Sequence, residues 1–187
     1  MPRTIILASA SPRRVELLRK IVRKFQVIPS RVRESAITAR SPLAFAVKAA
    51  LAKAADIAVR RKNAVVIGAD TIVVLGKKII GKPKSKKDAV RILKSLAGKT
   101  HLVITGLAVI DVKSGKKKTC YEITRVKMKK VKDKEILDYV KSGRPLDKAG
   151  GYGIQEIEDS FIDKIDGDYD NVVGLPVLAL KKLLCSF

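Results

Sequence analysis

The stretch Thr4-Ile5-Ile6-Leu7-Ala8-Ser9-Ala10-Ser11-Pro12-Arg13-Arg14 decides the fold class. Its apolar first half predicts a short buried strand over Thr4–Ala8. Ser11 followed by Pro12 is a typical helix start, with the serine as N-cap and the proline as the first helical residue. Apolar residues at helical spacing then predict a helix from Pro12 to Lys24. A strand that leads through a short turn into a helix is the building unit of α/β proteins.

The rest of the chain alternates between strand and helix patterns in the same way. The spacing of apolar residues and the capping signals predict strands at Phe25–Pro29, Ala64–Ala69, His101–Val112, Lys117–Lys130 and Ser160–Lys164, and helices at Leu43–Arg61, Ser85–Ala97, Asp133–Lys141 and Pro176–Leu184. Thr71–Ile80 is expected to form a hairpin, and residues 143–153 a glycine-rich irregular segment. Because hairpins interrupt the alternation, the expected architecture is α/β with a mixed sheet.

Length and composition favour one domain over residues 1–187. The chain is 47% hydrophobic, which is enough for a sizeable core, and we expect two lobes around a cleft. It has no apolar run of about 18 residues, so no membrane-spanning helix is expected. The apolar N-terminal stretch is too short for a signal peptide. Cys120 and Cys185 are too few for a disulfide framework, so we expect buried thiols and a cytoplasmic location.

The formal net charge of +22 attracts polyanions of any kind, such as nucleic acid, an anionic membrane surface or a phosphorylated substrate. Lys and Arg are spread over the whole chain, which favours a solvated, charged surface. A nucleic-acid-binding module without turnover remains the alternative function. Aromatic residues make up only 4% of the chain, and no stacking platform for bases is recognisable, so we expect no specific nucleic-acid partner.

The turn Ser9–Arg14 has the features of a phosphate site. The start of a helix offers free N–H groups and a positive partial charge, and Ser9 and Ser11 add hydroxyl donors. Arg13 and Arg14 add guanidinium groups that match phosphate oxygens. An ordinary helix cap with two surface arginines would have the same sequence, and spacing alone does not separate the two.

Two further motifs carry charge at predicted strand or loop ends. The first motif is Gly68-Ala69-Asp70-Thr71. The apolar run before it places the carboxylate of Asp70 at the end of a predicted strand, where it can ligate a divalent metal or accept a proton from water. An Asp that only closes a turn is the more common case. In Gly81-Lys82-Pro83, the glycine and proline restrict the backbone around Lys82, which would suit polyphosphate. An ordinary loop lysine is the alternative in so Lys-rich a chain.

Three other features carry polar side chains that could take part in binding or catalysis. In the glycine-rich stretch Asp147–Gln155, the amide of Gln155 can both donate and accept, so it can recognise a uracil or thymine edge; a structural turn is the alternative. The alternating aspartates of Asp166–Asp170 resemble a calcium loop, but Val177 stands where the last Glu ligand belongs. His101 has no recognisable catalytic partner, and we expect a solvated or satisfied side chain.

Taken together and in this order, the motifs resemble the Maf family of nucleotide pyrophosphatases over essentially the whole chain. The resemblance is carried by Ser9–Arg14 with Leu17-Leu18, Glu34, Lys53-Ala54, Gly68–Thr71, Gly81–Pro83, Asp147–Gly150, Tyr152–Gln155 and Gly167–Tyr169. It implies an elongated mixed sheet flanked by helices, with two lobes around a cleft. It also implies hydrolysis of a nucleoside triphosphate between the α- and β-phosphates, with a divalent metal such as Mg²⁺ or Mn²⁺, by a cytoplasmic homodimer.

The resemblance makes Asp70 the proton acceptor and places Ser9, Arg14, Glu34, Lys53 and Lys82 along the cleft. From these positions we expect Glu34 and Asp70 to bind the metal. We expect Ser9, Arg14, Lys53 and Lys82 to hold the phosphates. The residues Arg13, Thr71 and Gln155 mark the subfamily that prefers dTTP and UTP. Cleansing of the nucleotide pool and a link to division arrest are also implied by the family. A third alternative keeps the fold but changes the substrate toward modified nucleotides, modified pyrimidines included, or purine nucleotides.

One segment departs from the family pattern. Ser30-Arg31-Val32-Arg33-Glu34 carries arginines where the family often has acids, and only Glu34 keeps a carboxylate. If a neighbouring acid helps to hold the metal in the family, the site in this chain has one ligand fewer.

Overall fold

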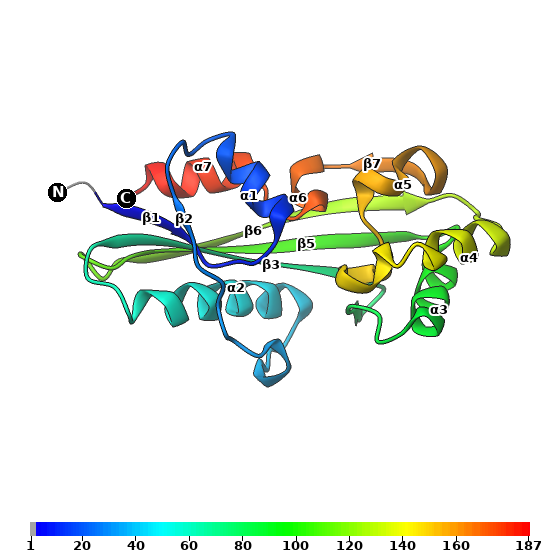
Figure 1. Ribbon diagram of the computed structural model, residues 1–187, viewed down its shortest axis with the longest axis horizontal. Helices are drawn as coiled ribbons and strands as arrows, with labels where there is room; N and C mark the ends of the chain where they lie inside the picture. The colour runs from blue at the N-terminus through cyan, green and yellow to red at the C-terminus, as the bar shows by residue number, and fades with distance from the viewer. Residues whose placement is uncertain (1–2) are drawn as a thin grey trace. The chain divides into compact units, whose positions relative to one another are not determined.

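The computed structural model describes residues 3–187, in which seven strands form one sheet (Figure 1). The strands are β1 (Thr4–Leu7), β2 (Gln26–Val27), β3 (Ala64–Leu75), β4 (Lys78–Ile80), β5 (Thr100–Asp111), β6 (Lys117–Met128) and β7 (Ile162–Asp166). Their order is β2-β1-β3-β5-β6-β7, and β4 pairs with β3 outside this path. Strand β1 runs parallel to β2 and β3, whereas β3–β4 and β6–β7 are antiparallel. The predicted mixed sheet is therefore confirmed.

Helices and short 3-10 turns connect these strands. The helices are α1 (Pro12–Arg19), α2 (Pro42–Ala58), α3 (Lys86–Leu96), α4 (Asp133–Lys141), α5 (Ile154–Phe161), α6 (Tyr169–Val173) and α7 (Val177–Cys185). The 3-10 turns are η1 (Glu34–Ala36), η2 (Arg144–Asp147) and η3 (Ala149–Gly151). In the part of the chain that the structure describes, no helix is both long and apolar enough to cross a membrane.

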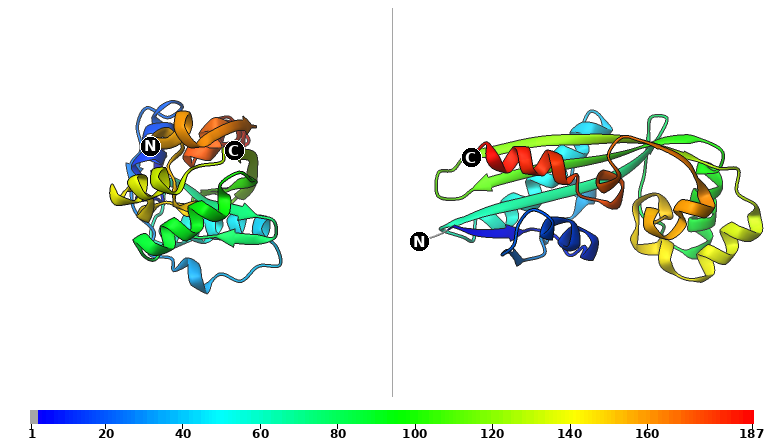
Figure 2. Two further views of the ribbon diagram at one scale, coloured as in Figure 1. Left: turned by 90° about the vertical axis from the view of Figure 1, so that its right-hand side faces the viewer. Right: turned by 90° about the horizontal axis from the view of Figure 1, so that it is seen from above.

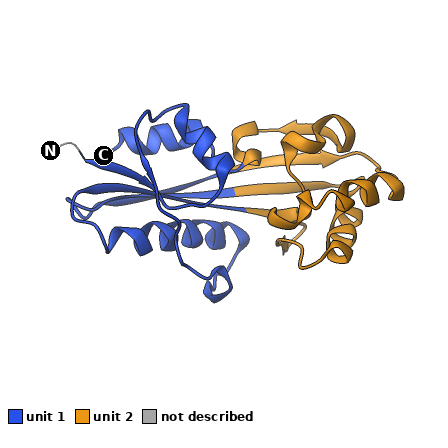
Figure 3. Ribbon diagram, in the orientation of Figure 1, with its two compact units in different colours: residues 1–71, 105–122, 174–187 blue, residues 72–104, 123–173 orange. Residues whose placement is uncertain are grey.

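The chain divides into two compact units (Figure 3). The first unit comprises residues 1–71, 105–122 and 174–187, and the second comprises residues 72–104 and 123–173. Strands β3, β5 and β6 each contribute residues to both units. Every functional residue predicted from the sequence can be assigned to one of the two.

In the first unit, helices cover both faces of the sheet. Helices α1 and α7 lie on one face and α2 on the other (Figures 1 and 2). Helix α2 lies unusually close because two strand residues opposite it are glycines. A side chain at Gly68 would overlap the carbonyl oxygen of Ala50, and one at Gly106 would overlap the backbone of Ala46. The backbone of α2 is therefore in direct contact with β3 and β5.

In the second unit, α3 packs against α4 and against the turns η2 and η3. Helix α3 buries Leu93 and Leu96, and α4 buries Ile136 and Val140. Capping signals at their starts and glycines just beyond their ends had predicted both helices. The glycine-rich segment is confirmed as irregular, since it forms two 3-10 turns rather than a longer helix.

Three expectations were wrong in detail. Ser160 and Phe161, expected in a strand, are the last residues of α5, and β7 begins at Ile162. The helical spacing of Ile154, Ile157 and Phe161, all buried, was the signal that this helix offered. The first helix ends at Arg19 rather than at Lys24. Cys185 is exposed and Cys120 only partly buried, so the two thiols are not the core residues that we expected.

Candidate active site

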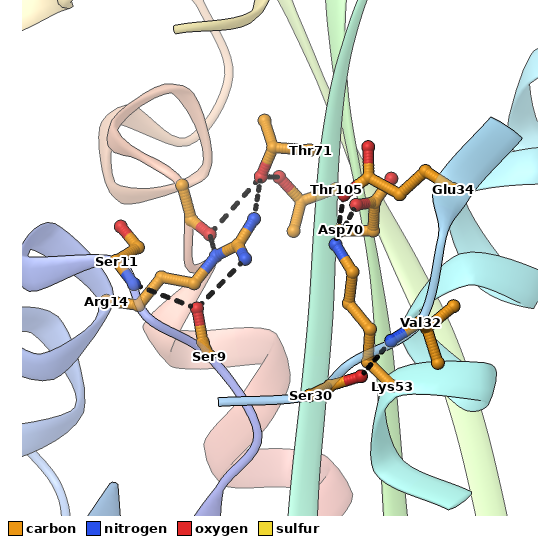
Figure 4. A network of polar contacts seen from close by, with 11 residues as sticks. Ser9, Ser11, Arg14, Ser30, Val32, Glu34, Lys53, Asp70, Thr71 and Thr105 are labelled. Carbon is orange, nitrogen blue, oxygen red and sulfur yellow. Dashed lines mark hydrogen bonds and ion pairs between the residues drawn. The ribbon is translucent and has the colours of Figure 1, made fainter. Parts of the chain in front are cut away.

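Asp70 lies on the α2 side of β3, buried to 3% exposure. The ammonium of Lys53, on α2, lies 2.5 Å from Asp70 Oδ1 and 2.6 Å from Glu34 Oε1, so one lysine joins two carboxylates (Figure 4). Lys53 is placed there by the helix contact with Gly68, because Ala50 and Ala54 on either side of it meet that glycine. The glycine two residues before Asp70 thus sets the distance between the lysine and the carboxylate.

The second oxygen of Asp70 has a different environment. Among the described residues, Asp70 Oδ2 is buried and has no hydrogen-bond partner. Burial raises the pKa of Asp70 above its ordinary value, and the Glu34 charge acts in the same direction, while Lys53 and Arg14 oppose the rise. The carboxylate is therefore more basic than an exposed one. It retains an oxygen that can accept a proton or bind a cation.

Glu34 reaches Lys53 from a loop that is tied to α2. The backbone N–H of Arg31 donates to Asp56 Oδ2 at 2.9 Å, and that of Val32 donates to Ser30 Oγ at 3.1 Å. Arg60 forms an ion pair with Asp56 at 3.0 Å. The Arg31 hydrogen bond lowers the pKa of Asp56, which keeps this anchor charged. Arg31, one of the two arginines that depart from the family pattern, thus ties the segment before Glu34 to α2 through its backbone.

Arg14 lies with Ser9 and Thr71, and Figure 4 shows this group apart from the Lys53 group, with β3 between them. Arg14 Nε donates to the carbonyl oxygen of Gly174 at 2.9 Å. Its Nη1 donates to Ser9 Oγ at 3.2 Å and its Nη2 to Thr71 Oγ1 at 3.1 Å. A guanidinium carries N–H groups beyond these three, so Arg14 keeps donors for an anion.

Neighbouring residues of a strand point to opposite faces, so Asp70 and Thr71 serve different groups. The hydroxyl of Thr71 also shares a hydrogen bond of 2.9 Å with Thr105 Oγ1. Thr105 is completely buried on β5. The two threonines therefore hold the guanidinium of Arg14 from the sheet side. Sequence reasoning missed Thr105, because a threonine within an apolar strand gives no signal of its partner.

The start of α1 keeps the features that suit an anion. Ser11 is the N-cap, as predicted, but its side chain makes no capping hydrogen bond. Its backbone N–H donates to Ser9 Oγ at 3.2 Å. The first turn therefore presents N–H groups that no side-chain cap occupies, beside a hydroxyl and a guanidinium. Arg13 lies half-buried in the same turn.

Lys82 and Gln155 belong to the second unit, where their loops are in contact. The N–H of Gly150 donates to the carbonyl oxygen of Gly81 at 3.1 Å, and Gly151 packs against Pro83. Gly150 has a φ of +72° and lies against Val73 of β3, so no other residue fits there without strain. The side chains of Lys82 and Gln155, both predicted site residues, are exposed. The structure thus brings together two motifs that are more than sixty residues apart in the chain.

With this geometry established, comparison with known proteins identifies the family. A family model described as Maf-like protein matches residues 4–187. The chain belongs to the Maf family. This Maf chain is 46% identical to the dTTP/UTP pyrophosphatase of Dictyoglomus turgidum over 188 residues, covering 100% of this chain and 97% of the relative.

Two more relatives of this Maf chain carry the same name. The dTTP/UTP pyrophosphatase of Aquifex aeolicus is 46% identical, with 96% of this chain and 93% of the relative covered. That of Methanosarcina barkeri is 44% identical, with 97% and 93% covered. Among solved structures, a nucleoside-triphosphatase / dITP/XTP pyrophosphatase from Mycobacterium abscessus has a TM-score of 0.45 at 10% identity, over 68% of this chain and 74% of that chain.

Of the two environments expected for His101, solvated or satisfied, the structure shows the second in part. His101 is 2% exposed and not solvated, and its Nε2 shares a hydrogen bond of 2.6 Å with the hydroxyl of Tyr152. Within residues 3–187, its Nδ1 has no partner. Burial lowers the pKa of His101 to about 4, so the ring is neutral at pH 7. The pair holds the glycine-rich loop from the side of β5.

Proposed function

We propose that this Maf protein hydrolyses dTTP and UTP to the monophosphate and pyrophosphate. The observation that carries the proposal is Asp70, a buried carboxylate with one oxygen bound to Lys53 and the other available as a base. The relatives named dTTP/UTP pyrophosphatase match over nearly their whole length, which supports the same reaction here.

In the proposed reaction, Asp70 takes a proton from water as the water oxygen attacks the α-phosphorus. A new P–O bond forms at that phosphorus, and the bond to the oxygen bridging the α- and β-phosphates breaks, so that pyrophosphate leaves. The raised pKa of Asp70 improves it as a general base, because proton transfer is most effective when the pKa approaches the working pH. Lys53 holds the carboxylate in place through Oδ1.

Charges that are already in place stabilise the phosphates during this reaction. Arg14 and Ser9 are oriented by their mutual hydrogen bond, and Lys53 has a third N–H beyond the two bound to carboxylates. Preorganised donors of this kind need no rearrangement as charge builds up. The resemblance assigns Lys82 to the phosphates as well, and the choice of base to Arg13, Thr71 and Gln155.

A divalent cation, Mg²⁺ or Mn²⁺, is part of the proposal. Among residues 3–187 no group of three or more His, Cys, Asp and Glu side chains could hold a metal ion. Two carboxylates joined through one lysine, with a buried Asp70 oxygen lacking a partner, nevertheless fit Mg²⁺, which is often bound by one or two carboxylates together with substrate phosphates. Asp70 and Glu34 would hold the ion, which would supply positive charge next to the phosphates.

The test is the substitution Asp70→Asn, assayed by pyrophosphate release from UTP. Loss of the base should lower kcat by about 10²–10⁴-fold. Asp163→Asn is a matched control, since within residues 3–187 the Asp163 carboxylate is engaged in a surface ion pair with Lys127. Undiminished turnover in Asp70→Asn would refute the mechanism.

The substrate range and the setting of the enzyme complete the proposal. We expect a cytoplasmic homodimer, without a specific nucleic-acid partner, that also accepts modified pyrimidine nucleotides. A panel of common and modified triphosphates would rank these substrates and test a role in cleansing the nucleotide pool. Binding of RNA or DNA in low salt without turnover of any triphosphate would favour a nucleic-acid-binding module instead.

A further inference from the structure

The side chain of Gln155 is not fixed by hydrogen bonds from the part of the chain that the structure describes. Gln155 is the second residue of α5, it is exposed, and none of the described residues forms a hydrogen bond with its amide. An exposed amide that recognises a base must nevertheless be presented in one orientation. That orientation depends on whatever holds the first turn of α5.

The hydroxyl of Tyr139, on α4, takes the place of the N-cap side chain that this turn lacks. The N-cap residue of α5 is Gly153, which has no side chain with which to cap. The N–H of Gly153 donates to the hydroxyl oxygen of Tyr139 at 3.2 Å, and that hydroxyl donates to Glu156 Oε2 at 2.7 Å. In a capping box, the carboxylate of the third helical residue reaches the N-cap N–H directly. Here the phenol stands between the two groups and joins them.

Lys148 holds the other oxygen of the same carboxylate. Its ammonium lies 3.2 Å from Glu156 Oε1, and it also bonds to Asp147 and to the carbonyl oxygen of Arg144. The lysine is only 6% exposed. A Cβ on Gly153 would lie 2.8 Å from Lys148 Cε, so the lysine stem packs directly on that glycine. Both oxygens of Glu156 are thus bound, and Gln155 lies between Glu156 and the packed glycine.

The ring of Tyr139 is itself held by packing. It meets Phe161, at the far end of α5, edge to face, with 5.7 Å between the ring centres. Burial raises the pKa of Tyr139 well above its ordinary value, so the hydroxyl keeps the proton that it donates to Glu156. The tyrosine therefore contacts both ends of the helix that carries Gln155.

We infer that Tyr139 is a positioning residue for base recognition: through Gly153 and Glu156 it orients Gln155, without itself touching the nucleotide. The inference rests on the proposed function, in which Gln155 recognises the pyrimidine. It adds a residue to the specificity machinery that no motif of the sequence indicated.

The test is a double-mutant cycle with Tyr139→Phe and Gln155→Ala, measured as kcat and KM for UTP. Tyr139→Phe keeps the ring on Phe161 and removes only the hydroxyl. It should raise KM about fivefold with kcat within about twofold, because one hydrogen-bonded link is lost outside the reacting centre. In the Gln155→Ala background, Tyr139→Phe should have almost no effect.

Two further variants keep the test independent of folding. Glu156→Leu removes the acceptor of the Tyr139 hydroxyl and should raise KM in the same way, without adding to Tyr139→Phe. Tyr121→Phe, an exposed tyrosine of β6, should leave both constants unchanged. Melting curves of all variants would identify any that fail to fold.

The outcomes separate the inference from the proposed function. If Tyr139→Phe has no effect, or has the same effect with and without Gln155, the inference is wrong although UTP is still hydrolysed. If the unmodified protein releases no pyrophosphate from UTP, the proposed function fails and the inference fails with it.

Discussion

The predicted site residues are held in opposite ways in the two units. In the first unit their polar and charged side chains bind one another, since Lys53 joins Asp70 to Glu34 and Arg14 bonds to Ser9. In the second unit the predicted site side chains, Lys82 and Gln155, are exposed, and other residues hold the backbone beside them. Charged groups stabilise a transition state best when they are already oriented before the reaction. A group that recognises a ligand must instead have donors and acceptors that are not bound within the protein.

The largest effect is expected from breaking the charged group itself. Lys53→Met removes the cation between two carboxylates and leaves Asp70 buried without a charge partner, so kcat for UTP should fall by about 10²–10³-fold. Pyrophosphate release measures this loss. Lys48→Met is the matched control on the same helix, because Lys48 is exposed and, among the described residues, donates to the carbonyl oxygen of Thr38 rather than to a carboxylate. A Lys53→Met enzyme of normal rate would contradict the role of the ion pairs.

A large effect on the free energy of unfolding is expected from protonation of His101 in the second unit. The folded pKa of His101 is about 4, below the unfolded value of about 6.5, so the unfolded chain binds more protons between these values. The contribution of neutral His101 is therefore complete above pH 6.5 and is lost as the pH falls towards 4. By pH 4.5 the loss should reach about 2–3 kcal/mol.

This loss can be measured by denaturant unfolding at pH 7 and pH 4.5. The variant His101→Gln keeps a polar partner for Tyr152 but cannot take up a proton. Its stability should depend less on pH, by the same 2–3 kcal/mol or so. If the free energy of unfolding depended on pH equally in the two proteins, protonation of His101 would not be the cause of the loss at low pH.

Arg14→Lys sharpens the comparison within the first unit. A lysine keeps the charge but lacks the planar group that reaches Gly174, Ser9 and Thr71 at once. We expect kcat/KM for UTP to fall about 10–30-fold, with most of the loss in kcat. Arg19→Lys, at the exposed end of α1, should leave kcat/KM for UTP unchanged. A loss confined to KM would indicate that Arg14 only attracts the substrate.

The smallest effect is expected from Gln155→Ala. Because Gln155 is exposed and makes no bond to the described residues, its removal should leave the melting temperature unchanged. Loss of its contact with the base should raise KM for UTP and dTTP about tenfold. Steady-state kinetics with both nucleotides checks this. A marked drop in melting temperature would show that the amide supports the fold instead.

The parts predictable from the sequence were those encoded locally. The apolar run before Asp70, the Ser11-Pro12 helix start and the glycine-rich loop each had a local signal, and all lie where it indicated. Thr105 and Tyr139 were not predictable. Their partners Thr71 and Glu156 lie 34 and 17 residues away in the chain, and the neighbouring sequence gives no signal of these contacts. The roles assigned to the site residues by the family resemblance remain predictions, tested by the substitutions above.

The alternation of Asp70 and Thr71 along β3 has a consequence for how this segment can evolve or be engineered. Removing or adding one residue between Ala64 and Ala69 would exchange the faces of everything that follows. The carboxylate would then lie on the side of the arginine, and the hydroxyl on the side of the lysine. Substitutions of the apolar side chains in this run cost packing, and one at Gly68 would also displace α2 and with it Lys53. A change of length would instead move both Asp70 and Thr71 to the wrong face at once, so the strand tolerates a change of length less well than a change of its apolar side chains.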